Sequence, residues 1–318
     1  MKALVFTGAG GREVMRVEER PDPKPGSDEV LVAVRFAGIN GADLSQRAGS
    51  YPAPPGSPAD IPGLEVAGEV VAKGDSVRGL ELGDRVFGLV GGGGIASRVV
   101  VHERHVTRVP DALTDEEAAA VPEVFITAHD AMATRGGLRP GDVMLVNGAN
   151  GGVGSAAVQL GVLGGARVFA SARSAHEQLA ELGAEPVMPD ESVARVREAG
   201  GADLVLELVG AQNLDGNLDA LATKGRVVIV GTGAGAETQI SLRKVMGKRA
   251  AIHGTVLRAR PLEEKALAVQ LFAHEVVPHL ASGRLRGLVD RVFPADEAAD
   301  AFDYFAAPGK FGKVLIAF

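Results

Sequence analysis

Cysteine and tryptophan are both absent from the 318 residues of this sequence. Without cysteine, the chain cannot form a disulfide, use a thiolate as a nucleophile or bind a metal ion through sulfur. Basic residues are in the minority, because 33 Lys and Arg face 40 Asp and Glu for a net charge of −7. Since nucleic-acid-binding proteins need a basic face, we expect no nucleic-acid partner.

Long apolar runs are missing as well. No stretch approaches the ~20 apolar residues of a membrane-spanning helix, and the N-terminal MKALVFTGAG turns polar too early for a signal peptide. We therefore expect no membrane partner and a cytoplasmic location. The hydrophobic fraction of 46% and the charged fraction of 23% are typical of an ordinary globular protein.

The most informative stretch that is present is DVMLVNGANGGVGSAAVQL, residues 142–160. A short apolar run, typical of a buried strand, is followed by several glycines and then by helix-forming residues. Strand, glycine turn and helix together predict a phosphate-binding turn, because the helix N-terminus offers free N–H groups. The pattern G-x-G-x-x-G has Ala149 in its first place, so a tight turn without a ligand remains the alternative.

The first part of the chain reads as β-rich. Residues 1–110 contain short apolar or alternating runs separated by Pro and Gly clusters, which is typical of a partly closed, barrel-like domain. Strands are expected at residues 3–6, 14–17, 29–36, 66–71, 85–89 and 98–101. After them, Thr114 and Glu117 have the spacing of a capping box, which predicts the start of a helix.

The rest of the chain alternates. Residues 141–260 predict strands at 143–147, 167–170, 204–208, 226–230 and 251–256, with helical patterns between them. Such alternation favours a parallel sheet covered by helices on both faces. Residues 261–281 and 295–305 read as helical, and 289–293 and 314–318 as strands. The apolar final strand can return to the sheet of the first domain, although the sequence alone does not prove it.

Several motifs together carry a family resemblance, and they are GINGAD (38–43), IPGLEVAG (61–68), GDRV (83–86), AAAVP (118–122), TA (127–128), GGVG (151–154) and FGKV (311–314). In these motifs the chain resembles the medium-chain dehydrogenase/reductase superfamily, and within it the zinc-free quinone oxidoreductase (zeta-crystallin-like) branch. Residues 46–52 and 257–260 are similar to the stress-inducible quinone oxidoreductase subgroup.

The resemblance implies a fold and an assembly. The expected class is α/β, with a GroES-like β-rich catalytic domain and a Rossmann doubly wound parallel-sheet cofactor domain. The catalytic domain would take residues 1–120 and 263–318, and the NADP-binding domain would take residues 121–262. The family also implies a homodimer, which would extend the sheet through an edge strand such as 251–256.

Metal ligands of the zinc-dependent relatives are missing from the motifs. Those relatives carry Cys where this chain has Asn40, and a His in the segment that here reads PADIPG, residues 58–63. The seven His residues are scattered without metal spacing, so we expect no metal. Without a Lewis acid, the substrate has to accept hydride readily, as quinones and carbonyl-conjugated alkenes do.

By resemblance, three residues lie beside the reacting groups. Asn40 would contact the nicotinamide and the substrate oxygen; a left-handed turn residue before Gly41 is the alternative. Tyr51 would stack on or hydrogen-bond a quinone, or else pack on the Pro-rich loop. Thr127 would contact the nicotinamide edge, or else be an ordinary helix residue. No general acid is assigned, since the final proton can come from water.

The choice of cofactor depends on the end of the second strand of the α/β region. An NAD enzyme has a carboxylate there to hold the ribose 2′-hydroxyl, but this chain has Ser171, Arg173 and Ser174. Arg173 can pair with a 2′-phosphate and the serines can hydrogen-bond to it, which predicts NADPH. A solvated Arg173 is the alternative. The segment after Ser174 is shorter than in the family, which leaves the detailed phosphate contacts open.

Further cofactor contacts are implied by the resemblance at the glycine turn and at later strand ends. They are Asn150, Gly151, Gly152, Val153, Gly154, Val209, Gly210, Gly231, Val256, Leu257 and Lys313. Gly210 and Gly231 can also be ordinary strand-terminating glycines, and Lys313 a solvated charge. The function that follows is an NADPH-dependent quinone reductase, with reduction of α,β-unsaturated carbonyls as the alternative. A cofactor-binding structural protein, like the crystallins of this family, is the alternative from another class.

Overall fold

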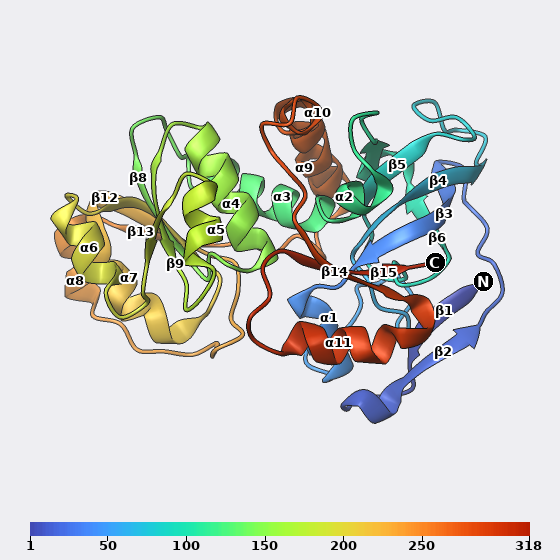
Figure 1. The fold of residues 1–318 in the computed structure, drawn as a ribbon, viewed down its shortest axis with the longest axis horizontal. Coiled ribbons are helices and arrows are strands. Elements are labelled where there is room, and N and C mark those ends of the chain that lie inside the picture. The colour runs from blue at the N-terminus through green and yellow to red at the C-terminus, as the bar shows by residue number, and fades with distance from the viewer. The chain divides into compact units, whose positions relative to one another are not determined.

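The computed structural model describes all 318 residues and divides into two compact units (Figure 1). Unit 1 comprises Met1–Ile126 and Leu257–Phe318, and unit 2 comprises Thr127–Val256. Both termini therefore belong to unit 1. Its second segment joins the first through strand pairing rather than through sequence proximity, as described below.

Unit 2 is built on one parallel sheet. Its strands are β8 (Val143–Asn147), β9 (Arg167–Ser171), β10 (Glu185–Val187), β11 (Ala202–Glu207), β12 (Leu221–Ile229) and β13 (Ala251–Gly254). All pairs are parallel, in the order β10-β9-β8-β11-β12-β13. This order confirms the predicted Rossmann fold class. The sequence missed β10, which has three residues, one of them Pro186.

Helices cover both faces of this sheet (Figure 1). They are α4 (Gly152–Leu163), α5 (His176–Glu181), α6 (Ser192–Glu198), α7 (Leu214–Ala220) and α8 (Leu242–Lys248). In Figure 1, α4 and α5 lie on one side of the strands and α6, α7 and α8 on the other. The sequence missed α8 because none of its residues is buried, so it has no apolar stripe to reveal it.

The sheet reverses its direction of growth between β8 and β11. The chain leaves β8 toward β9 on one side, whereas β11 pairs with the other edge of β8. In open α/β sheets, ligands bind outside the carboxyl ends of the strands at such a reversal. The core beneath it is tightly closed, with Leu145, Val205 and Val227 all fully buried.

Unit 1 contains two sheets. The first pairs β1 (Lys2–Phe6) with β2 (Met15–Glu19). The second has seven strands: β3 (Glu29–Gly38), β4 (Glu65–Lys73), β5 (Arg85–Leu89), β6 (Arg98–His102), β7 (Val106–Arg108), β14 (Val289–Pro294) and β15 (Lys313–Ala317). Its pairs are antiparallel except β14 with β15, which gives the β-rich domain that the sequence predicts.

One edge of β3 is shared by two strands. β6 pairs with residues 29–33 of β3, and β15 pairs with residues 36–38. In Figure 1 the red strands β14 and β15 accordingly lie beside the blue strand β3. The final strand thus returns to the first sheet, which the sequence had left open.

Most helices of unit 1 are short, and α9 is the longest of them with 14 residues. They are α1 (Gly41–Arg47), α2 (Asp115–Ala119), α9 (Leu262–Glu275), α10 (Val277–Ala281) and α11 (Ala298–Ala306). A further helix, α3 (Pro122–His129), begins in unit 1 and ends in unit 2, where it continues as a π-helical turn over Asp130–Arg135. The capping box predicted before α2 is confirmed. The Glu117 N–H donates to Thr114 Oγ1 at 3.2 Å, and the Thr114 N–H donates to Glu117 Oε2 at 2.9 Å.

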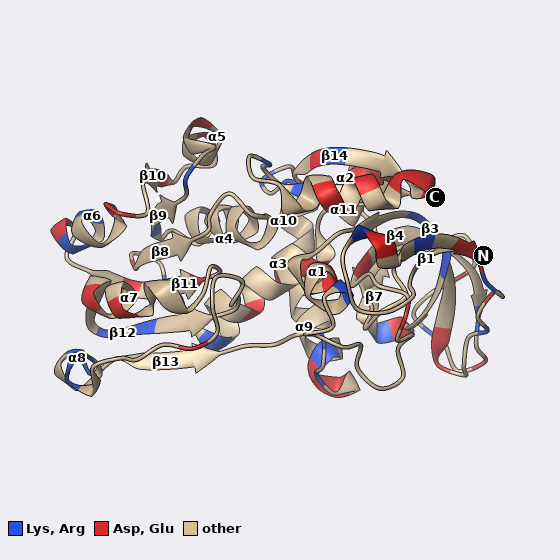
Figure 2. Cartoon of the chain, turned by 90° about the horizontal axis from the view of Figure 1, so that it is seen from below, with Lys and Arg blue, Asp and Glu red and all other residues tan.

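Charged residues of both signs are spread along the chain (Figure 2). In Figure 2, α8 carries basic residues where α7 carries acidic ones, and Lys244 Nζ lies 2.8 Å from carboxylate oxygens of both Asp215 and Asp219. No helix has both the length and the apolar character that a membrane crossing demands.

Candidate functional site

The glycine turn connects β8 to α4. Gly148 has a φ of +80°, which glycine adopts without strain. A Cβ on Gly154 would lie 2.3 Å from the carbonyl oxygen of Gly148, so only glycine allows this close packing of helix and turn. No side chain caps α4 at Gly151, and Gly151, Gly152 and Val153 are half-buried. The first N–H groups of α4 are therefore available to an anion.

The end of β9 lies directly against this turn. The carbonyl of Ser171 accepts hydrogen bonds from the N–H groups of Gly148 and Ala149, at 3.0 and 3.1 Å. Asn150 Nδ2 donates to Ser174 Oγ at 3.4 Å. The structure thus brings together Asn150, Ser171 and Ser174, which the sequence assigned to one cofactor.

Arg173 is exposed between these serines, and its guanidinium has no hydrogen bond or ion pair within the chain. The next turn is shaped by Ala175, which adopts a left-handed φ of 64° although it is not glycine. His176 Nε2 lies 2.8 Å from the carbonyl oxygen of Ala172 and closes the turn. Residues 171–175 thus supply an unpaired cation and two serines but no carboxylate, and this is the chemistry that a 2′-phosphate requires.

A carboxylate that the sequence analysis missed organises the neighbouring strand end. Glu207 is 1% exposed at the end of β11. Its Oε2 accepts from the side-chain amides of Asn147 and Asn217, at 2.8 and 2.7 Å. Its Oε1 accepts from the N–H groups of Val209 and Gly210, at 2.7 and 2.8 Å, and from Asn213 Nδ2 at 3.3 Å. Glu207 therefore fixes the backbone of Val209 and Gly210, two of the predicted cofactor contacts.

Gly210 and Gly231 have clear packing reasons to be glycine. A Cβ on Gly210, whose φ is +138°, would lie 2.7 Å from the carbonyl oxygen of Gly235, and a Cβ on Gly231 would lie 2.4 Å from that of Leu208. A cavity of about 60 Å³ lies at this strand end, and its walls include Glu207 and Gly210. The predicted contact of both glycines with the cofactor stays a prediction.

Thr127 is 7% exposed in α3, and its Oγ1 is buried without any hydrogen-bond partner in the chain. Such an orphaned hydroxyl is rare, because burial removes its water without replacing it. It therefore fits the predicted contact with a nicotinamide. Val256 is 54% exposed at the end of unit 2, and Leu257 is 7% exposed at the start of the second segment of unit 1.

Unit 1 contains a buried ion pair beside Asn40. Lys313 is 3% exposed, and its Nζ lies 2.5 Å from Glu65 Oε1, 2.7 Å from Asn40 Oδ1 and 2.8 Å from the carbonyl oxygen of Ile39. The alternative of a solvated Lys313 is therefore wrong. Because all three ammonium protons are engaged, Lys313 acts on the site through Asn40 and Glu65.

The amide of Asn40 is held in one orientation. Its Nδ2 donates to Glu65 Oε1 at 3.0 Å and to the carbonyl oxygen of Gly38 at 3.2 Å, while its Oδ1 accepts from Lys313. Flipping the amide would place donor against donor and acceptor against acceptor. The φ of Asn40 is −127°, so the alternative of a left-handed turn residue is wrong.

Asp43 fixes the backbone at Asn40 and at Gly63. It is 0% exposed, and its carboxylate accepts from the N–H groups of Asn40 and Gly63, at 2.8 and 2.9 Å. Burial raises the pKa of the Asp43 carboxyl to about 6, although those two N–H groups favour the ionised form. Gly63 has a φ of +103° and touches the backbone of Ile95 too closely for any side chain.

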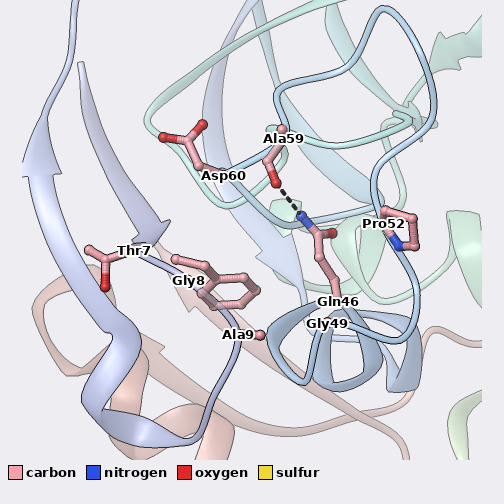
Figure 3. Close-up of a pocket in the computed structure, with 9 residues that line it drawn as sticks. Thr7, Gly8, Ala9, Gln46, Gly49, Pro52, Ala59 and Asp60 are labelled. Atoms are coloured by element: carbon pink, nitrogen blue, oxygen red, sulfur yellow. Dashed lines mark hydrogen bonds between the residues drawn. The ribbon is translucent and has the colours of Figure 1, made fainter.

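Tyr51 lies beside a buried arginine. Arg258 is 5% exposed, with its guanidinium carbon 5.3 Å from the centre of the Tyr51 ring and its Nη1 donating to the Tyr51 carbonyl at 3.3 Å. Arg258 Nη2 also donates to Gln46 Oε1 at 2.6 Å. Figure 3 shows Gln46 donating in turn to the carbonyl of Ala59. The loop that carries Tyr51 is therefore anchored by charge-assisted hydrogen bonds.

Gln46 also forms part of the wall of an open pocket of about 280 Å³ within unit 1 (Figure 3). Its other lining residues include Phe6, Ala9 and Pro52, together with the charged Asp60. None of the residues predicted to bind substrate or cofactor lines it. No group of three or more His, Asp or Glu side chains is placed to hold a metal ion.

Several of these polar residues escaped the sequence analysis. Glu65 and Asp43 lie inside motifs that carry the family resemblance, and this was the available signal for them. Arg258 lies in the segment 257–260 that was singled out for its subgroup resemblance. Glu207 had no signal, because a single carboxylate at a strand end resembles any solvated charge.

Comparison with known sequences identifies both units. The profile described as the alcohol dehydrogenase GroES-like domain matches residues 26–111, and the profile described as zinc-binding dehydrogenase matches residues 152–274. The quinone oxidoreductase of Lama guanicoe is 31% identical over 99% of this chain and 97% of its own length. A much larger protein, a phenolphthiocerol/phthiocerol polyketide synthase chain of Mycobacterium tuberculosis, is 32% identical over 96% of this chain, which spans 14% of its length.

Solved structures give a concordant result. The quinone oxidoreductase of Thermus thermophilus, solved alone and in complex with NADPH, is 35% identical with a TM-score of 0.87 over 100% of both chains. An NAD-dependent alcohol dehydrogenase is 31% identical with a TM-score of 0.87 over 100% of both chains. The CurK enoyl reductase is 26% identical with a TM-score of 0.87 over 99% of this chain and 98% of its own.

The match to quinone oxidoreductase extends over nearly the full length of both proteins. The GroES-like profile lies within the first segment of unit 1, and the dehydrogenase profile covers most of unit 2. The chain therefore belongs to the medium-chain dehydrogenase/reductase superfamily, and it is quinone oxidoreductase-like.

Proposed function

We propose that this protein is an NADPH-dependent reductase that transfers hydride to quinones without a metal ion. The observation that carries the proposal is the end of β9, where Asn150 Nδ2 donates to Ser174 Oγ, the neighbouring Arg173 is exposed and unpaired, and residues 171–175 include no carboxylate. The relatives named quinone oxidoreductase, one of them solved with NADPH, support it.

The residues of unit 2 fit a dinucleotide phosphate. The open N–H groups at the start of α4 suit the pyrophosphate, and Arg173 with Ser171 and Ser174 suits the 2′-phosphate. The orphaned Oγ1 of Thr127 suits the polar edge of the nicotinamide. When bound, this cofactor supplies hydride, which is the reducing equivalent of the reaction.

In unit 1, we assign the orienting role to Asn40 and the substrate contact to Tyr51. Asn40 Oδ1 keeps one lone pair after accepting from Lys313, and its position is fixed by Glu65 and Asp43. The Tyr51 ring is held by Arg258 while its hydroxyl has no partner in the chain. Val256, Leu257 and Lys313 remain in the predicted cofactor set, with Lys313 acting through Asn40.

Two measurements test the proposal. Isothermal titration of the purified protein with NADPH and NADH should show at least about 10-fold tighter binding of NADPH, because a charge-assisted phosphate pair adds roughly 1.5–3 kcal/mol. Steady-state assays should then show oxidation of NADPH by simple quinones. Equal affinity for both dinucleotides would contradict the cofactor choice, and a complete lack of quinone turnover would contradict the substrate class.

The likeness to an enoyl reductase favours a second candidate, reduction of α,β-unsaturated carbonyls. Both substrate types accept hydride and place negative charge on oxygen, so the same residues serve either. Parallel assays with quinones and enones compare the two through their kcat/KM values. Tight NADPH binding without turnover of either class would instead indicate a cofactor-binding structural protein.

We also propose a homodimer that forms through the free edge of the unit 2 sheet. β13 is the last strand in the sheet order, and its residues are half-buried or exposed. The preceding helix α8 exposes Leu242 and Met246, which are 70% and 74% accessible. Unpaired edges and apolar side chains at one place favour association with a second copy. Sedimentation equilibrium should give twice the chain mass.

A further inference from the structure

One carboxyl group in the polar interior of unit 1 has no partner. The other charged side chains there are all hydrogen-bonded within the unit, namely Asp43, Glu65, Arg258, Lys265 and Lys313. Glu123 donates its backbone N–H to Glu65 Oε2 at 2.8 Å, but its own carboxyl group accepts no hydrogen bond and forms no ion pair. The residue as a whole is half-buried.

Glu123 and Thr127 lie on the same helix, α3. Glu123 is the second residue of α3, and Thr127 follows four residues later. Side chains at this spacing share one face of a helix. The orphaned hydroxyl assigned to the nicotinamide edge and the unpartnered carboxyl therefore lie one helical turn apart on the same face.

The surroundings of Glu123 favour its neutral form. Burial raises the pKa of the Glu123 carboxyl to about 7, nearby Glu65 and Asp43 add to the effect, and Lys313 and Lys265 oppose it. Burial also raises the pKa of Tyr51, where Arg258 opposes and Glu123 adds. An acid with this pKa is protonated in a large fraction of molecules near neutrality, which is the condition for efficient proton donation.

We propose that Glu123 is the proton donor that completes the reduction, directly or through Tyr51. This inference rests on the proposed function. After hydride addition, the substrate is an anion with its charge on oxygen. The O–H bond of Glu123 breaks and a new O–H bond forms on a hydroquinone, or a C–H bond forms at the α carbon of an enolate. The two electrons of the reduction arrive with the hydride, and the Glu123 carboxylate regains its proton from water.

A purely structural role for Glu123 is the competing explanation. An acidic residue in the first turn of a helix stabilises the positive end of the helix dipole by about 0.3–1 kcal/mol. That role would change stability but would leave the pH dependence of turnover and the facial selectivity of protonation unaltered. Both quantities therefore separate the two explanations.

The first experiment compares the pH profiles of the wild type and Glu123→Gln, over about four pH units centred on neutrality. The wild-type kcat should fall as pH rises through about 7, because the donor loses its proton. Glu123→Gln should lower kcat by about 10²-fold and abolish this decline, while NADPH affinity stays within about 2-fold. A wild-type profile that is flat through this range would overturn the proposal without any variant.

Two variants control the result. Glu116→Gln removes an exposed carboxyl from the neighbouring helix α2, and it should leave both kcat and the pH profile unchanged. Glu123→Asp keeps an acid at the position, so it should recover part of the lost kcat and keep the decline at high pH. If Glu123→Gln retained wild-type kcat together with the same decline, Glu123 would not be the donor.

A second experiment uses an α-substituted enone reduced in D₂O. The wild type should add deuterium to one face of the α carbon, whereas Glu123→Gln should give both epimers because bulk water replaces the positioned acid. Deuterium on a single face with the variant would overturn the proposal. Lack of turnover by the wild type with quinones and enones alike would instead contradict the proposed function, so the two failures are distinguishable.

Discussion

Each unit contains a buried polar network, and the two are built differently. In unit 1, Lys313 is held between Glu65 and Asn40, and opposite full charges meet at 2.5 Å. In unit 2, the single charge of Glu207 is held by neutral donors, among them the amides of Asn147 and Asn217. Unit 1 therefore positions its residues with an ion pair, and unit 2 with amides and backbone N–H groups.

This difference predicts how each network fails. A buried ion pair that loses one partner leaves an uncompensated charge in a medium that solvates it poorly. A carboxylate surrounded by several neutral donors loses its interactions one at a time. The following changes test this contrast, from the largest expected effect to the smallest.

Removal of the Lys313 ammonium should have the largest effect. Lys313→Met leaves Glu65, which is 0% exposed, without its cation. We expect the free energy of unfolding to fall by about 3–5 kcal/mol, measured by urea denaturation. The exposed Lys24→Met is the control and should change stability by no more than about 0.5 kcal/mol. A loss below about 1 kcal/mol for Lys313→Met would show that the ion pair does not dominate unit 1.

The corresponding change in unit 2 is Glu207→Gln. All five partners of Glu207 are hydrogen-bond donors. The glutamine places an N–H group where one carboxylate oxygen was, and this group faces donors. The variant therefore loses at least one charge-assisted hydrogen bond. We expect a loss of about 2–3 kcal/mol in unfolding free energy and weaker NADPH binding. Glu237→Gln, an exposed site in the same unit, should change neither. Equal losses of unfolding free energy for Lys313→Met and Glu207→Gln would contradict the predicted difference between the two networks.

Arg173→Ala tests a residue that is outside both networks. Because its guanidinium has no partner in the chain, stability should be unchanged within about 0.5 kcal/mol. NADPH should bind about 10- to 100-fold more weakly, while NADH binding stays the same, as measured by calorimetry. Arg197→Ala, another exposed arginine of unit 2, should leave both affinities unaltered. A parallel loss of NADH affinity would contradict the assignment to the 2′-phosphate.

Thr127→Val should give the smallest effect, with opposite signs for stability and binding. It replaces an unpartnered buried hydroxyl by a methyl of similar shape, so stability should rise by up to about 1 kcal/mol. NADPH affinity should fall by roughly 3- to 10-fold through the loss of one neutral hydrogen bond. Thr127→Ser keeps the hydroxyl and should retain the affinity. An unchanged Kd for Thr127→Val would remove Thr127 from the site.

Elements with a strong local signal were predictable from the sequence. β5 and β8 have the bounds that their apolar runs predict, and the capping box before α2 places the start of that helix. β10 and α8 were missed because the first is three residues long and the second has no buried face. The position of Arg173 at the end of β9 could be predicted because it lies at a fixed distance along the chain from the glycine turn.

What the sequence by itself determined is the set of features that depend on neighbours in the chain, namely the period of strands and helices, the glycine turn and the absence of an acid near Arg173. Only the tertiary structure decided that Lys313 is buried against Asn40, 273 positions away, and that the Glu123 carboxyl lies in the polar interior of unit 1 without a partner. The physical reason is that hydrogen bonds and charge pairs act through space over a few ångströms. Residues that are distant in sequence therefore gain their chemical roles only after the sheet of unit 1 has brought its two segments together.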